Sequence, residues 1–255
     1  MAHVPSGIWV SLSPARRMAH EMLRHARRVP SAPMARTFNL AALATARQQA
    51  DSAPSWTAIF VQAYGLVCQE FAELRRAFIP WPTAHLYEHP HSTCALVVER
   101  SWQDETILLG SKIRAPELMA LTSIQELIRY YKETPLWQVG DYRQVLRFGR
   151  LPWFLRRFAF WQTLYLSGYK RAKRFGTFMV SSYGSLGAEQ VHPIAPFTTL
   201  LTFGPISPCG EVVVKVVYDQ RVLGGRCVAR CLCRLEEVLN ASVREELHTS
   251  GRKVA

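Results

Sequence analysis

Near the C-terminus, a strand-like run, a short loop with two glycines and a helix-like run follow one another directly. Residues 211–218 (Glu-Val-Val-Val-Lys-Val-Val-Tyr) consist mostly of β-branched and aromatic side chains, which favour a strand. Residues 219–225 (Asp-Gln-Arg-Val-Leu-Gly-Gly) form the loop, and residues 226–240 have the composition of a helix. The sequence therefore predicts a strand, a tight loop and a helix in direct succession.

The loop resembles the Asp-His-Arg-Val-x-Asp-Gly signature of the acyltransferase subunit of 2-oxoacid dehydrogenase complexes, a family related to chloramphenicol acetyltransferase. In that family the histidine is the general base and the second aspartate orders the active-site loop. This chain has Gln220 at the histidine position and Gly224 at the aspartate position. A carboxamide does not accept a proton near neutral pH, so Gln220 cannot replace the base. The resemblance therefore implies the fold and leaves the activity open.

Four segments upstream of the loop also resemble the family and occur in its order: residues 9–19, 38–47, 60–78 and 175–187. The last is similar to the strand Gly-x-Phe-Thr-Ile-Ser-Ser-x-Gly-x-Leu-Gly, in which one serine hydroxyl steadies the tetrahedral oxyanion. That position falls on Ser181. The resemblance defines an acyltransferase-like domain over residues 8–240, with an insertion at about 135–174 and a polar tail at 241–255. No lipoyl domain or subunit-binding domain is expected.

The resemblance implies a two-layer α/β sandwich with a mixed β-sheet. It also implies a homotrimer whose active site lies between subunits, so that Gln220 of one chain would face Ser181 of its neighbour. Coenzyme A or acyl-CoA would be the co-substrate, and no metal is expected. The motif loop would consist of Asp219, Arg221, Gly224 and Gly225, and the family's matching aspartate is usually structural and paired with a basic group.

Two other titratable side chains could replace the missing general base. His192 follows the serine strand and is the best candidate, while Asp219 is the other option. A surface histidine at the end of a strand is the alternative interpretation of His192. Residues 85–89 (His-Leu-Tyr-Glu-His) match a zinc-protease pattern, but that pattern binds metal only on a helix, and prolines flank the segment here.

The net charge of +12 is concentrated in the insertion, where nine basic residues and one acidic residue lie between positions 141 and 174. The centre of the insertion, residues 151–166, is apolar almost all round and is expected to be helical from Pro152 onward. Aromatic and basic side chains together favour a membrane interface. The residues expected to contact such a surface are Trp153, Arg156, Arg157, Trp161, Lys170, Arg171, Lys173 and Arg174.

Two other interpretations of the insertion stay open. It could pack between subunits or along a substrate tunnel. Nucleic-acid binding is disfavoured, because no recognised nucleic-acid motif accompanies the basic residues. The membrane interpretation would make a lipid or a lipid-linked molecule the acyl acceptor.

The N-terminus lacks the features of a signal peptide, and no run of about 18 apolar residues is present. Six cysteines without paired zinc-site spacing fit reduced thiols. We therefore expect a cytoplasmic protein, peripheral at the inner face of a membrane if the insertion binds lipid. Two functions follow: a stand-alone acyl-CoA-dependent acyltransferase, or a pseudoenzyme that acts as a binding or assembly subunit.

Local patterns also predict elements outside the motif loop. A helix is expected at 14–28 with Ser13 as its cap, and a longer one at 56–78. A hairpin is expected from strands at 94–99 and 105–110, followed by a helix at 115–134.

Overall fold

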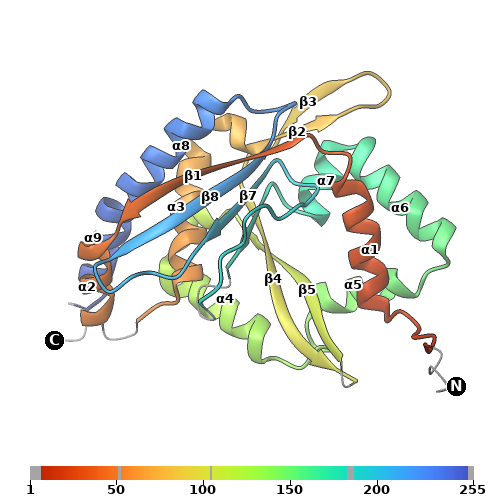
Figure 1. The fold of residues 1–255 in the computed structure, drawn as a ribbon, viewed down its shortest axis with the longest axis horizontal. Helices are drawn as coiled ribbons and strands as arrows, with labels where there is room; N and C mark the ends of the chain where they lie inside the picture. Colours follow the sequence, from red (N-terminus) through yellow and green to blue (C-terminus); the bar gives the residue numbers. More distant parts are fainter. Residues whose placement is uncertain (1–6, 51–52, 104, 183–186, 252–255) are drawn as a thin grey trace, which may run out of the picture.

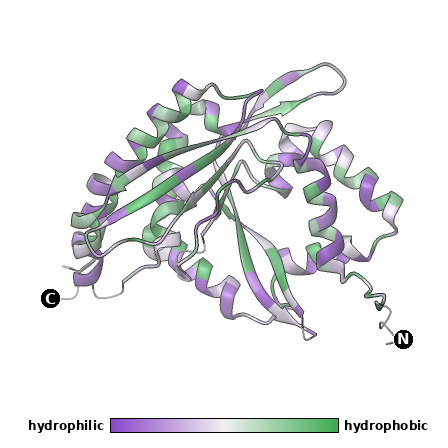
Figure 2. Ribbon diagram, viewed as in Figure 1, coloured by the Kyte–Doolittle hydropathy of each residue, from purple (hydrophilic) through white to green (hydrophobic). Residues whose placement is uncertain are grey.

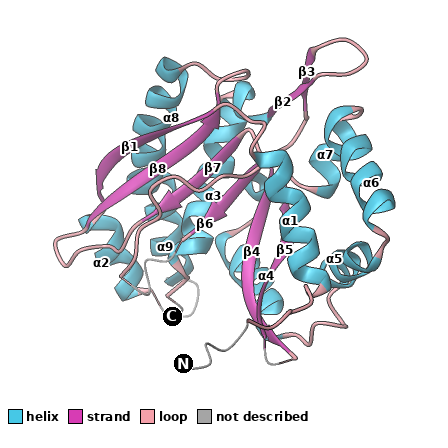
Figure 3. Ribbon diagram, turned by 45° about the vertical axis from the view of Figure 1, so that its right-hand side comes forward, coloured by secondary structure: helices cyan, strands magenta, loops and turns pink. Residues whose placement is uncertain are grey.

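The computed structural model describes residues 7–50, 53–103, 105–182 and 187–251, which form an α/β fold around one mixed sheet (Figure 1, Figure 3). The strands are β1 (Ser31–Asn39), β2 (Arg76–Ile79), β3 (His85–Glu88), β4 (Thr93–Trp102), β5 (Glu105–Arg114), β6 (Phe178–Ser181), β7 (Thr199–Phe203) and β8 (Glu211–Asp219). Six of them form the sheet in the order β1-β8-β7-β6-β4-β5, and β2 pairs with β3 separately. Strand β6 is parallel to β4 and β7, and the other pairs are antiparallel. The expected α/β fold with a mixed sheet is confirmed.

The helices fall into two groups on either side of the sheet (Figure 1). The α-helices are α1 (Pro14–Ala26), α2 (Ala41–Gln49), α3 (Trp56–Glu70), α4 (Leu121–Glu133), α5 (Gly140–Arg150), α6 (Trp153–Tyr165), α7 (Gly168–Arg174), α8 (Gly225–Val238) and α9 (Arg244–Gly251). Helices α3, α4 and α8 pack on one face of the sheet, while α1 and α5 contact β5 on the other.

The main core lies between the sheet and α3. Phe60 stacks on Phe203 of β7 with ring centroids 4.1 Å apart, and Tyr64 meets Phe178 of β6 edge-on at 4.9 Å. Burying each such ring contributes about 1.5–3 kcal/mol. Green segments on α3 and on the strands show this apolar layer in Figure 2. Burial on nearly every side explains why the α3 sequence is apolar all round.

Helix α3 ends eight residues earlier than expected, so the prediction of one helix over 56–78 is wrong. A 3-10 turn (Ala72–Arg75) and β2 follow α3 instead. The Arg75 side chain donates to the Cys68 carbonyl at the end of α3, and also to the carbonyls of His89 and Pro90 beyond β3. These contacts between distant segments outweigh local helix propensity.

The helix expected at 115–134 also begins later. Ala115 has a left-handed backbone, with φ 47°, and a 3-10 turn (Pro116–Leu118) precedes α4. The helix expected at 14–28 is confirmed as α1, and its cap Ser13 accepts a hydrogen bond from the Arg16 amide. The hairpin is confirmed as β4 and β5.

The insertion folds into α5, α6 and α7, which pack with α1 beside the β4–β5 end of the sheet (Figure 1). Gly149 of α5 lets the helices approach, because a Cβ there would lie 2.1 Å from the Pro14 carbonyl oxygen. The segment expected as a polar tail continues as a π-turn (Leu239–Val243) and α9. Val243 and Leu247 are buried, so this segment packs against the rest of the domain.

Candidate functional site

The motif loop is held by an ion pair at its first residue. Asp219 ends β8 and is fully buried. Its carboxylate accepts hydrogen bonds from the Arg221 amide (3.0 Å) and from Arg221 Nε (2.9 Å) and Nη2 (2.7 Å). The Arg221 guanidinium also lies 4.6 Å from the centre of the Phe78 ring. The Asp219 carboxylate therefore has a structural role in holding the loop.

Arg171 gives the buried carboxylate a second neighbouring cation. It is itself buried and donates to the carbonyls of Phe78 and Pro196. Burial lowers the pKa of Arg171 to about 10, and the negative charge of Asp219 opposes that shift. At neutral pH the guanidinium therefore stays charged and forms a second buried cation beside the Asp219–Arg221 pair.

Gln220 is exposed at the tip of the loop. Its backbone amide donates to the Pro30 carbonyl, and Gly224 precedes α8 with an extended backbone. The amides of Val222 and Leu223 both donate to the Asp219 carbonyl. Backbone hydrogen bonds and the Asp219–Arg221 pair therefore order this loop without a carboxylate at position 224.

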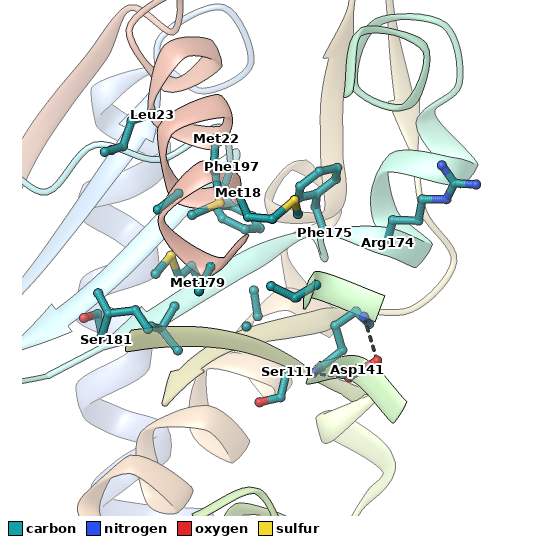
Figure 4. A pocket seen from close by; sticks show the side chains of 18 of the residues that line it. Met18, Met22, Leu23, Ser111, Asp141, Arg174, Phe175, Met179, Ser181 and Phe197 are labelled. Atoms are coloured by element: carbon teal, nitrogen blue, oxygen red, sulfur yellow. Dashed lines mark hydrogen bonds and ion pairs between the residues drawn. The ribbon is translucent and has the colours of Figure 1, made fainter. Parts of the chain in front are cut away.

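Ser181 ends β6 and faces a largely apolar cavity of about 410 Å³. The cavity lies between α1, α5, α6, strands β4–β6 and the segment that precedes β7. Figure 4 shows Ser181 on one side of it, with Met18, Met22 and Met179 nearby. Leu23, Leu108 and Ile194 also line the cavity but keep 41–49% of their surface exposed, so they form its open rim.

One chain does not bring Ser181 and Gln220 together. Ser181 pairs with Thr202 on β7, which pairs with Lys215 on β8, five residues before Gln220. With about 3.3 Å per residue and 4.8 Å per strand, the two residues lie roughly 20 Å apart. A site that uses both side chains therefore needs two copies of the chain.

His192 lies at the same edge of the sheet as Gln220. Its Nε2 atom is 3.2 Å from Ser31 Oγ, and Ser31 is the strand partner of Asp219. The ring is exposed, while the flanking Gln190 and Pro193 line the cavity. The structure thus places this imidazole beside the motif loop and not beside Ser181 of the same chain.

The residues expected to contact a membrane separate into two sets. Arg156 and Arg171 are buried, with Arg156 Nε 3.8 Å from the Glu21 carboxylate, so both lie inside the protein. Trp161 is partly buried against Trp81. The exposed residues are Trp153, Arg157, Lys170, Lys173 and Arg174, joined by Phe154 and Phe158 on the outer face of α6.

The zinc-protease pattern does not lie on a helix. His85 and Glu88 belong to β3, where the His85 ring lies against the Thr83 carbonyl and the His89 ring against Tyr87. Within the described ranges, no three His, Cys, Asp or Glu side chains are grouped to hold a metal ion. Among the described residues, no helix is both long enough and apolar enough to cross a bilayer.

Sequence reasoning missed two polar groups near the cavity. The Oε1 atom of Gln190 is buried with no hydrogen-bond partner among the described residues, and so is Oγ1 of Thr202 beside Ser181. The period-two alternation of β7 places Thr202 and Leu200 on one face and could have indicated the threonine. Gln190 lies outside any strand, so no local pattern indicates it.

Several solved structures of acetyltransferases have a similar fold. A probable dihydrolipoamide acetyltransferase from Listeria monocytogenes aligns over 100% of this chain and 99% of its own, with TM-score 0.63 and 16% identity. The dihydrolipoamide acetyltransferase of Azotobacter vinelandii aligns over 97% and 100%, with TM-score 0.68 and 16% identity. A chloramphenicol acetyltransferase aligns over 90% and 96%, with TM-score 0.53 and 12% identity. No protein-family model and no curated protein sequence matches the chain. The expected likeness in fold is therefore confirmed.

Proposed function

We propose that this protein binds an acyl-CoA, with the reacting carbonyl at Ser181 and the motif loop of a second copy opposite it. The observation that carries the proposal is the position of Ser181 at an apolar cavity, in a fold shared with acetyltransferases. A serine hydroxyl can donate a hydrogen bond to the oxyanion that forms when a thioester is attacked. Coenzyme A would be the leaving group.

The proton of the acceptor needs a base that Gln220 does not provide. His192 is the candidate, because Ser31 holds it at the sheet edge where Gln220 also lies. A second copy that brings Gln220 to Ser181 brings His192 to the same neighbourhood. The acceptor would be a lipid or lipid-linked molecule, since the exposed aromatic and basic residues of α6 and α7 suit a membrane surface.

The second candidate is a catalytically inactive relative that serves as a binding or assembly subunit. Gln220 and Gly224 favour it, because both side chains with family roles in proton transfer and loop order are replaced. Both candidates predict binding of acyl-CoA or a similar ligand at Ser181 or assembly with other copies. Only the first predicts turnover.

Acyl-CoA binding and turnover distinguish these candidates, with Ser181→Ala and Ser182→Ala as a matched pair. Ser182 is the next residue and donates instead to the Phe203 carbonyl. If wild-type protein transfers acyl groups, Ser181→Ala should reduce the rate about 10²–10³-fold while Ser182→Ala changes it little. Binding without turnover would favour the inactive relative. Absence of both binding and turnover would contradict the acyl-CoA proposal.

A further inference from the structure

The apolar cavity exists because small residues lie on both of its walls. Ala95, Val97 and Gly110 form the floor on β4 and β5, while Ala19 and Ala159 face them from α1 and α6. Protein interiors are packed about as densely as organic crystals and hold few voids. Larger apolar side chains at these positions would fill the space, so a hollow of this size indicates a ligand.

The walls suit a flexible hydrocarbon chain. Met18, Met22 and Met179 line the cavity together with Phe148, Phe160 and Phe197. Methionine side chains are unbranched and adapt to irregular apolar shapes. An apolar cavity of about 150 Å³ holds one benzene molecule, so about 410 Å³ has room for roughly 12–16 carbon atoms.

The charged side chains at the cavity already have partners within the protein. Lys112 Nζ lies 2.8 Å from Asp141 Oδ1, and Arg174 Nη1 donates to Thr163 Oγ1 at 2.9 Å. The Asp141 carboxylate balances the charge of Lys112, and the Arg174 guanidinium is solvated because its side chain is exposed, so a ligand in the cavity meets no unbalanced buried charge. The ligand is therefore uncharged where it lies in the cavity.

One polar group in the lining is suited to the ligand's head group. Ser181 lines the cavity, and its hydroxyl can both donate and accept a hydrogen bond. A head that offers one acceptor and one donor, such as a hydroxyl group, fits it.

We infer that this cavity binds an unbranched aliphatic chain of about ten or more carbons with an uncharged polar head near Ser181. The inference deepens the proposed function by naming the class of one substrate, yet binding of the chain requires no acyl transfer. Helix α6 supports it, because its inner side walls the cavity while its outer side exposes Trp153, Phe154 and Phe158. A ligand drawn from a lipid phase would meet that outer face first.

Gly110 offers a variant that fills the cavity and spares the fold. It lies on the cavity side of β5 with Leu108 and Lys112, and an added Cβ meets no atom within 4 Å. Its neighbour across the sheet, Val97, lies next to Ser181, so Gly110 is about 10 Å from Ser181. The Gly110→Phe side chain should occupy the space that we assign to the alkyl chain.

The experiment is calorimetric titration of the full-length chain with linear alcohols from 1-hexanol to 1-dodecanol. Wild-type affinity should rise about threefold to fourfold per methylene group. Gly110→Phe should weaken 1-decanol binding at least tenfold. The matched control is Thr106→Phe on the same face of β5, outside the cavity lining, and it should bind like wild type.

Thermal unfolding of both variants verifies that they are folded. The inference is overturned if wild type does not bind 1-decanol, if affinity does not increase with chain length, or if folded Gly110→Phe binds like wild type. Alcohol binding without acyl-CoA binding or turnover would leave the inference intact and contradict the proposed function. Acyl transfer by a protein whose alcohol affinity does not depend on chain length would support the proposed function and contradict the inference.

Discussion

At position 220 the chain presents a carboxamide on an exposed loop, and at position 224 it has open space where a side chain could fit. Gln220→His combined with Gly224→Asp should therefore be accepted without a clash. If Ser181 stabilises an oxyanion, an added general base should raise the acyl-transfer rate about 10²–10⁴-fold. The measurement is release of free coenzyme A from acyl-CoA in the presence of an acceptor alcohol.

The single substitutions are the controls for this residue-scale prediction. Gln220→His alone should give less than the double variant, because the signature that the loop resembles combines the histidine with an aspartate at position 224. A folded double variant that binds acyl-CoA and shows no gain would contradict the roles assigned to Ser181 and position 220.

At the scale of elements, α6 and α7 pack against each other, and both carry exposed cations. Three of these cations, Arg157, Lys170 and Lys173, can be changed to glutamine without touching the buried Arg156 or Arg171. Each contributes about 1 kcal/mol at an anionic surface, so the triple variant should bind anionic liposomes roughly a hundredfold more weakly at low salt. Liposome co-sedimentation at two salt concentrations measures this, and higher salt should weaken wild-type binding.

A matched variant removes the same charge elsewhere. Arg114, Arg129 and Lys132 are exposed on β5 and α4, outside α6 and α7, and their change to glutamine should have little effect. Equal losses in the two triple variants would show that net charge alone drives adsorption. If wild-type protein does not bind anionic liposomes at low salt, the membrane proposal is contradicted.

For the whole molecule, the separation of Ser181 and Gln220 decides the assembly that we expect. Because roughly 20 Å divides them within one chain, a shared site requires neighbouring copies, and a ring of three lets each chain supply both halves. Light scattering should report three times the chain mass of 29.0 kDa, or a multiple of that trimer. A monomer at micromolar concentration would contradict the shared site, although the apolar cavity within one chain would be unaffected.

Local patterns in the sequence determined the elements whose faces they encode. The valine-rich run of β8 predicts a buried strand, and the apolar run of α3 predicts a helix that belongs in the core. Ser13 predicts the start of α1, and Pro152 predicts where α6 begins. The resemblance of the motif loop and of the serine strand to the acyltransferase family implied the α/β fold and selected Ser181 and Gln220.

Tertiary structure alone decided the features that depend on contacts between distant segments. Residues 76–79 form β2 and not a helix because β3 supplies their hydrogen-bond partners. Arg156 and Arg171 are buried, although the local composition predicts that they lie on a basic surface. Tertiary structure also formed the cavity, since Ala19, Ala95, Gly110 and Ala159 come from four separate elements. Side-chain periodicity records which face of an element is buried, but it does not record which element that face meets. For that reason the sequence determined the fold class and one half of the site, and only the assembled sheet and helices determined the shape of the space that Ser181 faces.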